Sequence, residues 1–174
     1  SCRWVDQRRQ VGLRSRIAIR DFRGEGHSVG ATNEETFAAT PDASVLNIFL
    51  HLAASDSSLG FVVIDVESAF LQPRLEAHEI FAVNPPKDVK VPGKIWKVLV
   101  PWYGWRRASQ KYQEYQIEIM QRNGFEQCQI EPCVTRHPES RLRTLTHGDD
   151  TIALGKREPL KSFEGFMGEN FVCS

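Results

Sequence analysis

The pattern of apolar and polar positions along the chain predicts helices and strands that follow one another without strict alternation. Pro41 and Asp42 are typical of a helix start, and apolar residues at helical spacing then continue to a polar stretch at residues 56–60. The short apolar run from Phe61 ends at an acid, Asp65, and its length and β-branched content favour a buried strand. Further strands are predicted near residues 16–20, 80–83, 95–100, 133–136, 142–146 and 152–154, and further helices over 107–122 and 159–170. This order favours an α+β fold.

Three local signals complete the expected fold. Glycines between residues 24 and 30 predict a loop, and Asn123-Gly124 is a typical stop for the helix over residues 107–122. The sequence HGDDT, from His147 to Thr151, lies between two apolar runs and predicts a tight hairpin with acids at its tip. The predicted inner face of the helix over residues 107–122 consists of Tyr112, Tyr115, Ile119 and Met120.

Composition indicates a globular protein, and the charge distribution changes the first impression of its partners. The chain has 174 residues, 41% of them apolar, which is compatible with one domain or part of one. It begins at Ser1 without an initiator Met, and we expect it to be part of a longer protein. No run of about 18 apolar residues occurs, so we expect no membrane-spanning helix.

Lys and Arg balance Asp and Glu at 22 each, which by itself argues against a nucleic-acid partner. However, the cations gather in residues 1–23 and 89–113, and the second stretch has six cations, interleaved aromatic residues and no acid. Such a stretch is typical of a groove that follows phosphates and stacks bases.

The four cysteines show no disulfide spacing, so we interpret them as reduced thiols of an intracellular protein. Cys128, Cys133 and His137 allow a zinc interpretation. No fourth ligand follows at a suitable spacing, and packing of a local strand is the favoured explanation.

Three carboxylates carry the strongest chemical signal. Asp65 closes a buried strand, and Asp149 and Asp150 are adjacent at a turn, where they repel one another unless a cation joins them. If the two strands are neighbours in one sheet, the three acids converge on a site that suits Mg²⁺. On spacing alone, each acid also has a structural interpretation, because Gly-Asp-Asp is good turn chemistry and an Asp after a strand is common.

Six segments in order resemble the reverse transcriptase of copia-type long-terminal-repeat retrotransposons, from about Arg14 to Phe171. They are RSRIAIRDF from Arg14, ETFAATP from Glu35, VIDVESAFLQPRLEAHEIFAVNPP from Val63, IWKVLVPWYGWRRASQKY from Ile95, GFEQCQIEPCV from Gly124 and HGDD from His147. The resemblance implies a polymerase palm, an antiparallel sheet with packed helices, plus partial fingers and no thumb. Residues 1–174 would be a partial reverse transcriptase domain, with fingers and the first palm helix over about 1–60 and mainly palm, with the nucleotide and template loop, over about 61–174.

The resemblance also implies the residues of the site. Asp65, Asp149 and Asp150 match the catalytic carboxylates, and together with the backbone of Val66 they would hold two Mg²⁺ ions, or Mn²⁺ in their place. Asp65 and Asp149 would bind metal directly, with Asp150 in support. Two such ions about 3.5–4 Å apart can activate a 3′-hydroxyl and stabilise the leaving pyrophosphate.

Residues for the nucleotide and the nucleic acid follow from the same resemblance. Arg16, assisted by Arg14, matches the cation that holds the triphosphate, and Phe70 matches the aromatic that excludes a 2′-hydroxyl. Without the resemblance, Phe70 would be assigned to the core and both arginines to a solvated strand face. Val66 and Gly104 complete the implied nucleotide site, and the implied contacts to nucleic acid are Arg106, Arg107 and Lys111.

The function implied is that of an RNA-directed DNA polymerase, a nucleotidyltransferase that transfers a nucleotide from a dNTP to a primer 3′-hydroxyl. Its partners would be an RNA or DNA template–primer duplex and dNTP. The rest of a Pol polyprotein would supply the thumb, the RNase H and the integrase for DNA integration. No membrane would be involved. The element would be a transposable element whose polymerase is intracellular, in cytoplasmic virus-like particles or the nucleus. The alternatives are a catalytically inactive relic that keeps the fold and binds nucleic acid, and a metal-dependent phosphohydrolase with His147 as base.

Four positions depart from the family's pattern. His147 stands in place of Tyr and Gly148 in place of a small branched apolar residue, while Ser109 replaces Pro and Tyr112 replaces Trp. Glycine at position 148 is expected to loosen the turn that carries the acids. The predicted geometry is that Asp65 and Asp149 lie close enough to share an ion on the open face of an antiparallel sheet.

Overall fold

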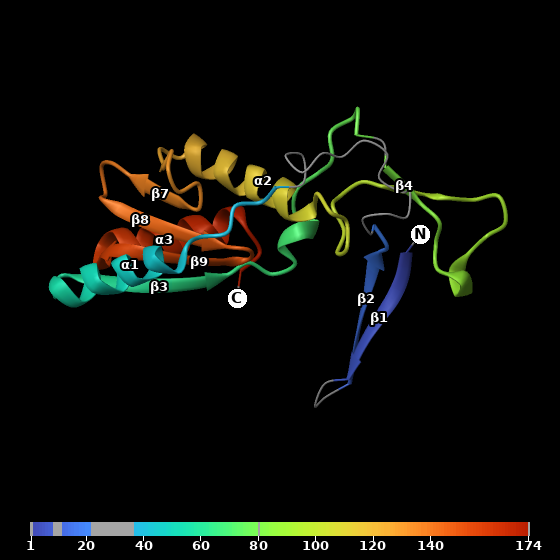
Figure 1. The fold of residues 1–174 in the computed structure, drawn as a ribbon, viewed down its shortest axis with the longest axis horizontal. Coiled ribbons are helices and arrows are strands. Elements are labelled where there is room, and N and C mark those ends of the chain that lie inside the picture. Colours follow the sequence, from blue (N-terminus) through green and yellow to red (C-terminus); the bar gives the residue numbers. More distant parts are fainter. Residues whose placement is uncertain (1, 9–11, 22–36, 80, 174) are drawn as a thin grey trace. The chain divides into compact units, whose positions relative to one another are not determined.

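The computed structural model describes residues 2–8, 12–21, 37–79 and 81–173 (Figure 1). The chain divides into two compact units. The ribbon unit contains Ser1–Phe37 and Phe70–Tyr112, and the sheet unit contains Ala38–Ala69 and Gln113–Ser174. The predicted glycine loop over residues 24–30 and the start of the ETFAATP segment lie outside the described residues. The residues 70–112, which the sequence groups with residues 61–174, belong to the ribbon unit.

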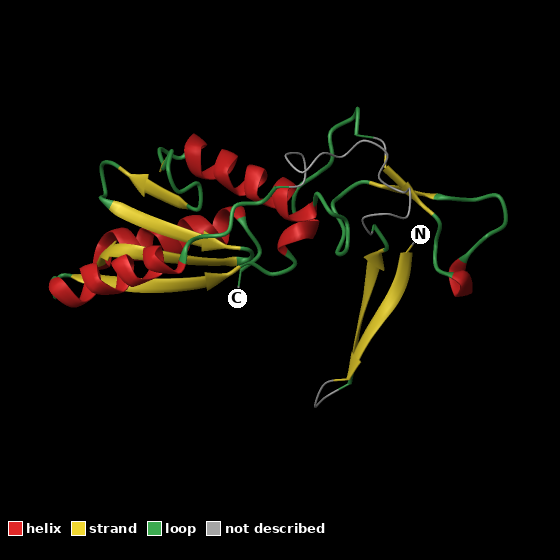
Figure 2. Ribbon diagram, in the orientation of Figure 1, coloured by secondary structure: helices red, strands yellow, loops and turns green. Residues whose placement is uncertain are grey.

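The sheet unit is built on one antiparallel sheet (Figure 2). In sheet order its strands are β3 (Leu59–Asp65), β9 (Asp150–Lys156), β8 (Leu142–His147), β7 (Val134–His137) and β6 (Glu126–Gln127). The helices are α1 (Ala43–Ser55), α2 (Ala108–Arg122), which crosses into this unit at Gln113, and α3 (Arg157–Asn170). The α+β prediction is therefore confirmed, with helices and antiparallel sheets in the described residues.

Helix α1 covers one face of this sheet. It begins after Asp42, whose carboxylate accepts the Ser44 N–H at 2.8 Å and satisfies one unpaired amide of the first turn. Within the helix only Phe49 is buried, in a cluster with Leu145 and Leu154. Strand alternation and register place these two leucines on the same face of the sheet as Asp65.

Helices α2 and α3 lie on the opposite face. Leu160 of α3 packs over Gly60 of β3, and Phe163 and Met167 are buried on the same helix. The inner stripe of α2 differs from the prediction, because its buried residues are Ala108, Tyr112, Gln116 and Met120. Tyr115 and Ile119 are only half-buried. Successive i, i+4 positions form one helical stripe, and here that stripe includes a glutamine that the apolar pattern did not identify.

The ribbon unit contains two antiparallel ribbons. One pairs β1 (Cys2–Arg8) with β2 (Leu13–Ile19), and the other pairs β4 (Phe81–Val83) with β5 (Trp96–Val98). Their core comprises Cys2, Ile19, Val83 and Val98, with Trp96, Trp102 and Trp105 packed against it. Trp96 therefore serves in packing. Strand β1 was not predicted, because its sequence CRWVDQR is polar and depends on β2 for its pairing.

Gly104 closes the base of the β1–β2 ribbon. It adopts φ +82°, and a Cβ at this position would clash with the carbonyl oxygen of Ile19. The neighbouring Tyr103 carbonyl accepts the Ile19 N–H at 2.8 Å. The backbone at Gly104 thus lies close against β2, and glycine allows both the positive φ and the contact.

Within the described residues, no helix has the length and the apolar character needed to cross a lipid bilayer.

Substituting Gly104→Ala should loosen the base of the ribbon. We expect the opening free energy at the Ile19 amide, measured by native-state hydrogen exchange, to fall by about 2–4 kcal/mol from backbone strain plus the clash. Gly93→Ala is the matched control, since Gly93 has φ +73° but no described atom within 4 Å of a Cβ. Equal losses in the two variants would contradict the packing role of Gly104.

Candidate functional site

The β3–β9 register places two of the predicted carboxylates directly opposite each other. Asp65 is the last residue of β3, Asp150 is the first of β9, and the two are cross-strand partners. Directly opposed residues project from the same face of a sheet, with their Cβ atoms about 4.5–5.5 Å apart. His147, the last residue of β8, is the partner of Asp150 on its other side. All three residues are exposed and form a row across one end of the sheet.

Asp149 lies at the same end of the sheet, in the turn between β8 and β9. It lies with Gly148 between β8 and β9, and its carbonyl oxygen accepts the Val66 N–H at 3.0 Å. Gly148 has φ +66°, and the first central position of a two-residue hairpin turn favours glycine for this reason. The turn is therefore fastened to the residue after Asp65. The prediction paired Asp65 with Asp149, whereas the residue in register with Asp65 is Asp150.

The row lies on the uncovered end of its face. Helix α1 packs over Leu154, near the far end of β9, and over Leu145, two residues before His147 in β8. Val63, on the same face as Asp65 and next to it, is 64% exposed, and Ile152 opposite Val63 is half-buried. Asp65 and Asp150 therefore project from an exposed part of this face, and the predicted sharing of an ion by Asp65 and Asp149 stays a prediction.

The donor set consists of carboxylate oxygens, which suit a hard cation such as Mg²⁺. Among the described residues, no group of three or more His, Cys, Asp or Glu side chains is already gathered around one point as a metal site. Like charges repel, so a cation would be needed to draw Asp65, Asp149 and Asp150 together. The negative charge of this region also acts on Cys173. Burial raises the pKa of the Cys173 thiol, and the charges of Asp65 and Glu67 raise it further.

A second cluster forms within the ribbon unit, and we call Arg16, Phe70, Tyr103 and Tyr112 the aromatic–arginine cluster. The guanidinium of Arg16 lies over the Tyr103 ring at 5.0 Å from its centroid. The Phe70 ring centroid is 5.4 Å from that of Tyr103 and 6.3 Å from that of Tyr112. Two residues predicted for nucleotide binding, Arg16 and Phe70, are thus joined through Tyr103, which the sequence identified only as an aromatic near cations.

The face of the β1–β2 ribbon that carries Arg16 is basic. Register and alternation place Arg3, Arg14 and Arg16 on one face of β1 and β2, and Asp6 on the other. Most of this ribbon is exposed. A two-stranded basic ribbon is a form that nucleic-acid grooves and phosphates accept.

The cations predicted to contact nucleic acid have acidic neighbours that the acid-free stretch over residues 89–113 did not reveal. Glu79 Oε1 forms a salt bridge with Lys111 Nζ at 2.8 Å and a second with Arg107 Nη2 at 3.5 Å. Burial alone would raise the pKa of Glu79. Hydrogen bonds from Lys111 and from the Glu76 amide, and the charges of Lys111 and Arg107, outweigh it, so the pKa of Glu79 is lowered. The backbone amide of Arg106 donates to Asp21 at 3.2 Å.

The zinc alternative does not match the structure. Cys133 is buried in the cluster around Phe49, and burial, then the Glu131 charge, raise the pKa of its thiol to about 11. Cys128 is exposed, and His137 Nδ1 accepts the Ser140 N–H at 3.2 Å. Packing explains Cys133, as the local strand interpretation predicted.

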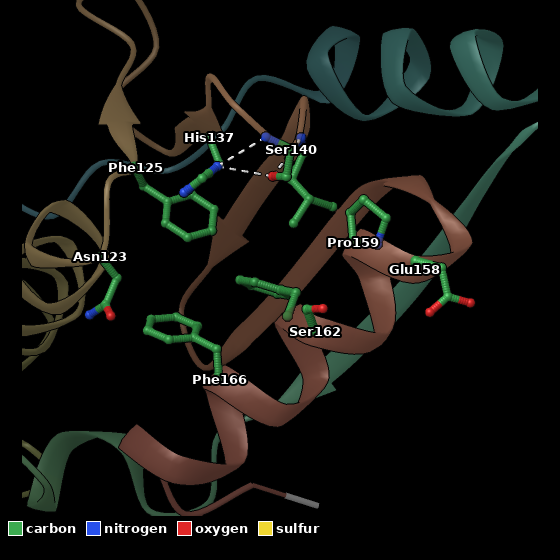
Figure 3. Close-up of a pocket in the computed structure, with 10 residues that line it drawn as sticks. Asn123, Phe125, His137, Ser140, Glu158, Pro159, Ser162 and Phe166 are labelled. Atoms are coloured by element: carbon green, nitrogen blue, oxygen red, sulfur yellow. Dashed lines mark hydrogen bonds between the residues drawn. The ribbon is translucent and has the colours of Figure 1, made fainter.

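His137 also borders a cavity of about 420 Å³ (Figure 3). Figure 3 shows Phe125 and Phe166 on one side of it and Pro159 and Ser162 on the other. Leu142, at the start of β8, lines this cavity. His147 is the last residue of β8 and lies next to the acids. None of the predicted site residues lines this cavity.

No protein-family model and no curated protein matches the chain.

The ion pairs of Glu79 should make stability depend on pH. We expect Glu79→Gln to lower the unfolding free energy by about 1–3 kcal/mol at neutral pH. A lowered pKa contributes stability that is complete above the ordinary value of 4.5 and is lost as the pH falls through the folded-state pKa. Urea unfolding of both proteins between about pH 3 and 7 measures this difference.

Glu76→Gln is the matched control, because Glu76 is an exposed acid of the same loop. An equal pH-dependent loss in both variants would show that general charge, rather than the Glu79 ion pairs, is responsible.

Proposed function

We propose that this chain supplies the palm and part of the fingers of an RNA-directed DNA polymerase from a copia-type retrotransposon. The observation that carries the proposal is the convergence of Asp65, Asp149 and Asp150 from two distant segments on one open end of an antiparallel sheet. These are the acids, in the order along the chain, that the family resemblance requires. The reaction is transfer of a nucleotide from a dNTP to a primer 3′-hydroxyl.

The carboxylates are the groups that would hold the metal. Asp65, Asp149 and Asp150 offer oxygen ligands. Val66 lies beside them, because its backbone N–H donates a hydrogen bond to the Asp149 carbonyl oxygen. Two Mg²⁺ ions, or Mn²⁺ in their place, would supply Lewis-acid activation of the 3′-hydroxyl and stabilise the charge on the leaving pyrophosphate. The exposure of all three acids leaves them accessible to a nucleotide and to a primer end.

The aromatic–arginine cluster supports the nucleotide-binding part of the proposal. A guanidinium binds phosphate oxygens through two parallel hydrogen bonds, and the contact with Tyr103 limits the orientations that Arg16 can adopt. Phe70 is wedged between Tyr103 and Tyr112, so its ring is held in place by packing. A fixed ring is suited to excluding a 2′-hydroxyl by steric contact. Arg14 adds positive charge on the same face as Arg16.

Contacts to the template–primer duplex are assigned to basic residues of the ribbon unit. The exposed face with Arg3, Arg14 and Arg16 supports electrostatic attraction of phosphates. Arg106, Arg107 and Lys111 remain candidates, with Arg107 and Lys111 sharing the charge of Glu79. The larger assembly, a Pol polyprotein with thumb, RNase H and integrase in virus-like particles or the nucleus, belongs to the same proposal.

The carboxylates provide the direct test. Asp65→Asn and Asp150→Asn should each reduce Mg²⁺-dependent addition of a single nucleotide to a primer by roughly 10³-fold, as expected when several kcal/mol of charge stabilisation is lost. Asp56→Asn is the matched control, since Asp56 is an exposed acid before the other end of β3. Radiolabelled primer extension by the 174-residue chain measures the rates.

Two other results would replace the proposal. Duplex binding without any nucleotide addition would support the inactive relic. The register of His147 with Asp150 favours a second candidate, a metal-dependent phosphohydrolase in which His147 is the base. Release of phosphate from a nucleotide in the absence of primer, lost in His147→Gln, would establish that activity instead.

The role of Phe70 can be separated from packing by sugar selectivity. Phe70→Val should raise the ratio of kcat/KM for ATP to that for dATP by about 10-fold or more, because a smaller side chain leaves room for the 2′-hydroxyl. The readout is steady-state single-nucleotide addition with each nucleotide. A residue that only packs would lower both values together and leave the ratio unchanged.

A further inference from the structure

A buried chain of polar side chains lies directly behind the acid hairpin. Gln116 Nε2 of α2 donates to Thr151 Oγ1 at 2.9 Å, and Thr151 Oγ1 lies 3.3 Å from Thr146 Oγ1. Gln116 is 1% exposed, Thr151 0% and Thr146 9%. These three residues form what we call the Gln116 network.

The network joins both arms of the hairpin to the helix. Thr151 follows Asp150 in β9, Thr146 precedes His147 in β8, and the two threonines are cross-strand partners. Thr151 is also the partner of Ile64, the residue before Asp65. Strand alternation places the threonines on the face opposite the acids, so α2 holds the hairpin from behind.

Stability alone does not account for this network. The Oε1 atom of Gln116 is buried and has no hydrogen-bond partner among the described residues. An unsatisfied buried polar atom is unfavourable, and an apolar side chain of the same size would fill the position without it. Each such atom in a folded protein calls for an explanation.

We infer that Gln116 is a positioning residue, which through Thr151 and Thr146 fixes the backbone that carries Asp149 and Asp150. The inference rests on the proposed function of these acids as metal ligands. Metal ligands must be held within about 0.5 Å of their working geometry, and an exposed two-residue turn cannot achieve this without support from behind. Val66 fastens the turn from the β3 side, and Gln116 fastens its arms from the helix side.

The same face of the sheet contains a matched pair of buried threonines, of which Thr135 lies on β7, outside the hairpin. Thr135 Oγ1 and Thr144 Oγ1 are 2.6 Å apart, on β7 and β8, and these residues are 2% and 0% exposed. Their burial and chemistry resemble those of Thr151. A substitution at Thr135 therefore reports the loss of a buried threonine hydrogen bond away from the acids.

The test compares Gln116→Met, Thr151→Val and Thr151→Ser with Thr135→Val in the 174-residue chain. The main readout is Mn²⁺ binding, followed by the electron paramagnetic resonance of free Mn²⁺, with urea unfolding and single-nucleotide addition beside it. We expect Gln116→Met and Thr151→Val to weaken Mn²⁺ binding and lower kcat by roughly 10–100-fold, with KM for dNTP unchanged. Thr151→Ser, which keeps the hydroxyl, should stay close to wild type.

The control and the double variant sharpen this result. Thr135→Val should lower the unfolding free energy yet leave Mn²⁺ affinity unchanged, and Gln116→Met combined with Thr151→Val should bind Mn²⁺ no more weakly than either alone. Equal weakening of Mn²⁺ binding in Thr135→Val and Thr151→Val would overturn the inference. So would a Gln116→Met variant that is less stable but binds Mn²⁺ like wild type.

Failure of the proposed function would have a different signature. If the wild-type chain binds Mn²⁺ through Asp65 and extends no primer, the polymerase proposal fails. The Mn²⁺ affinities of the variants still decide the role of Gln116 in that case. If Asp65→Asn binds Mn²⁺ as wild type does, the acids are not the metal site and the inference about Gln116 falls with them.

Discussion

The antiparallel pairing of β3 with β9 is the constraint on which the candidate site depends. A shift of one residue in this register would turn Asp65 to the opposite face from Asp150, because side chains alternate along a strand. Gly60 of β3 lies under Leu160 of α3, whose Cδ1 would stand 3.6 Å from a Cβ at that position. A slip of β3 by one residue would bring Leu59 or Phe61 there, so the packing of α3 against β3 favours the register that aligns the acids.

Local periodicity was sufficient for the elements that bury their own apolar residues. The three helices, β3 and the hairpin with acids at its tip were all predicted. Strand β1 was missed because its polar sequence becomes a strand only by pairing with β2. The types of residue at the site were also readable from the sequence, but the pairing of Asp65 with Asp150 was not, since nothing local to either strand specifies its partner.

Buried polar contacts are the part of the site that sequence reasoning did not find. Glu79 lies outside the acid-free stretch and still neutralises two of its cations, because the chain folds back on itself. Gln116 interrupts an apolar stripe and would be taken for a surface residue by its type alone. Both residues fix the orientation of another group, at a cost in desolvation that apolar packing would have avoided. A polar residue at a core position of a predicted helix is the signal that could have identified Gln116.

The exposed β1–β2 ribbon has a further consequence for how the protein behaves in solution. Within the described residues the ribbon has only two strands, so each strand has an outer edge with unpaired backbone groups, which is a template for aggregation between copies. The charges of Arg3, Arg14 and Arg16 oppose such edge-to-edge association, because two copies would bring like charges together. The basic face therefore serves colloidal stability as well as the proposed attraction of phosphates, and salt, which screens charge, weakens both effects together.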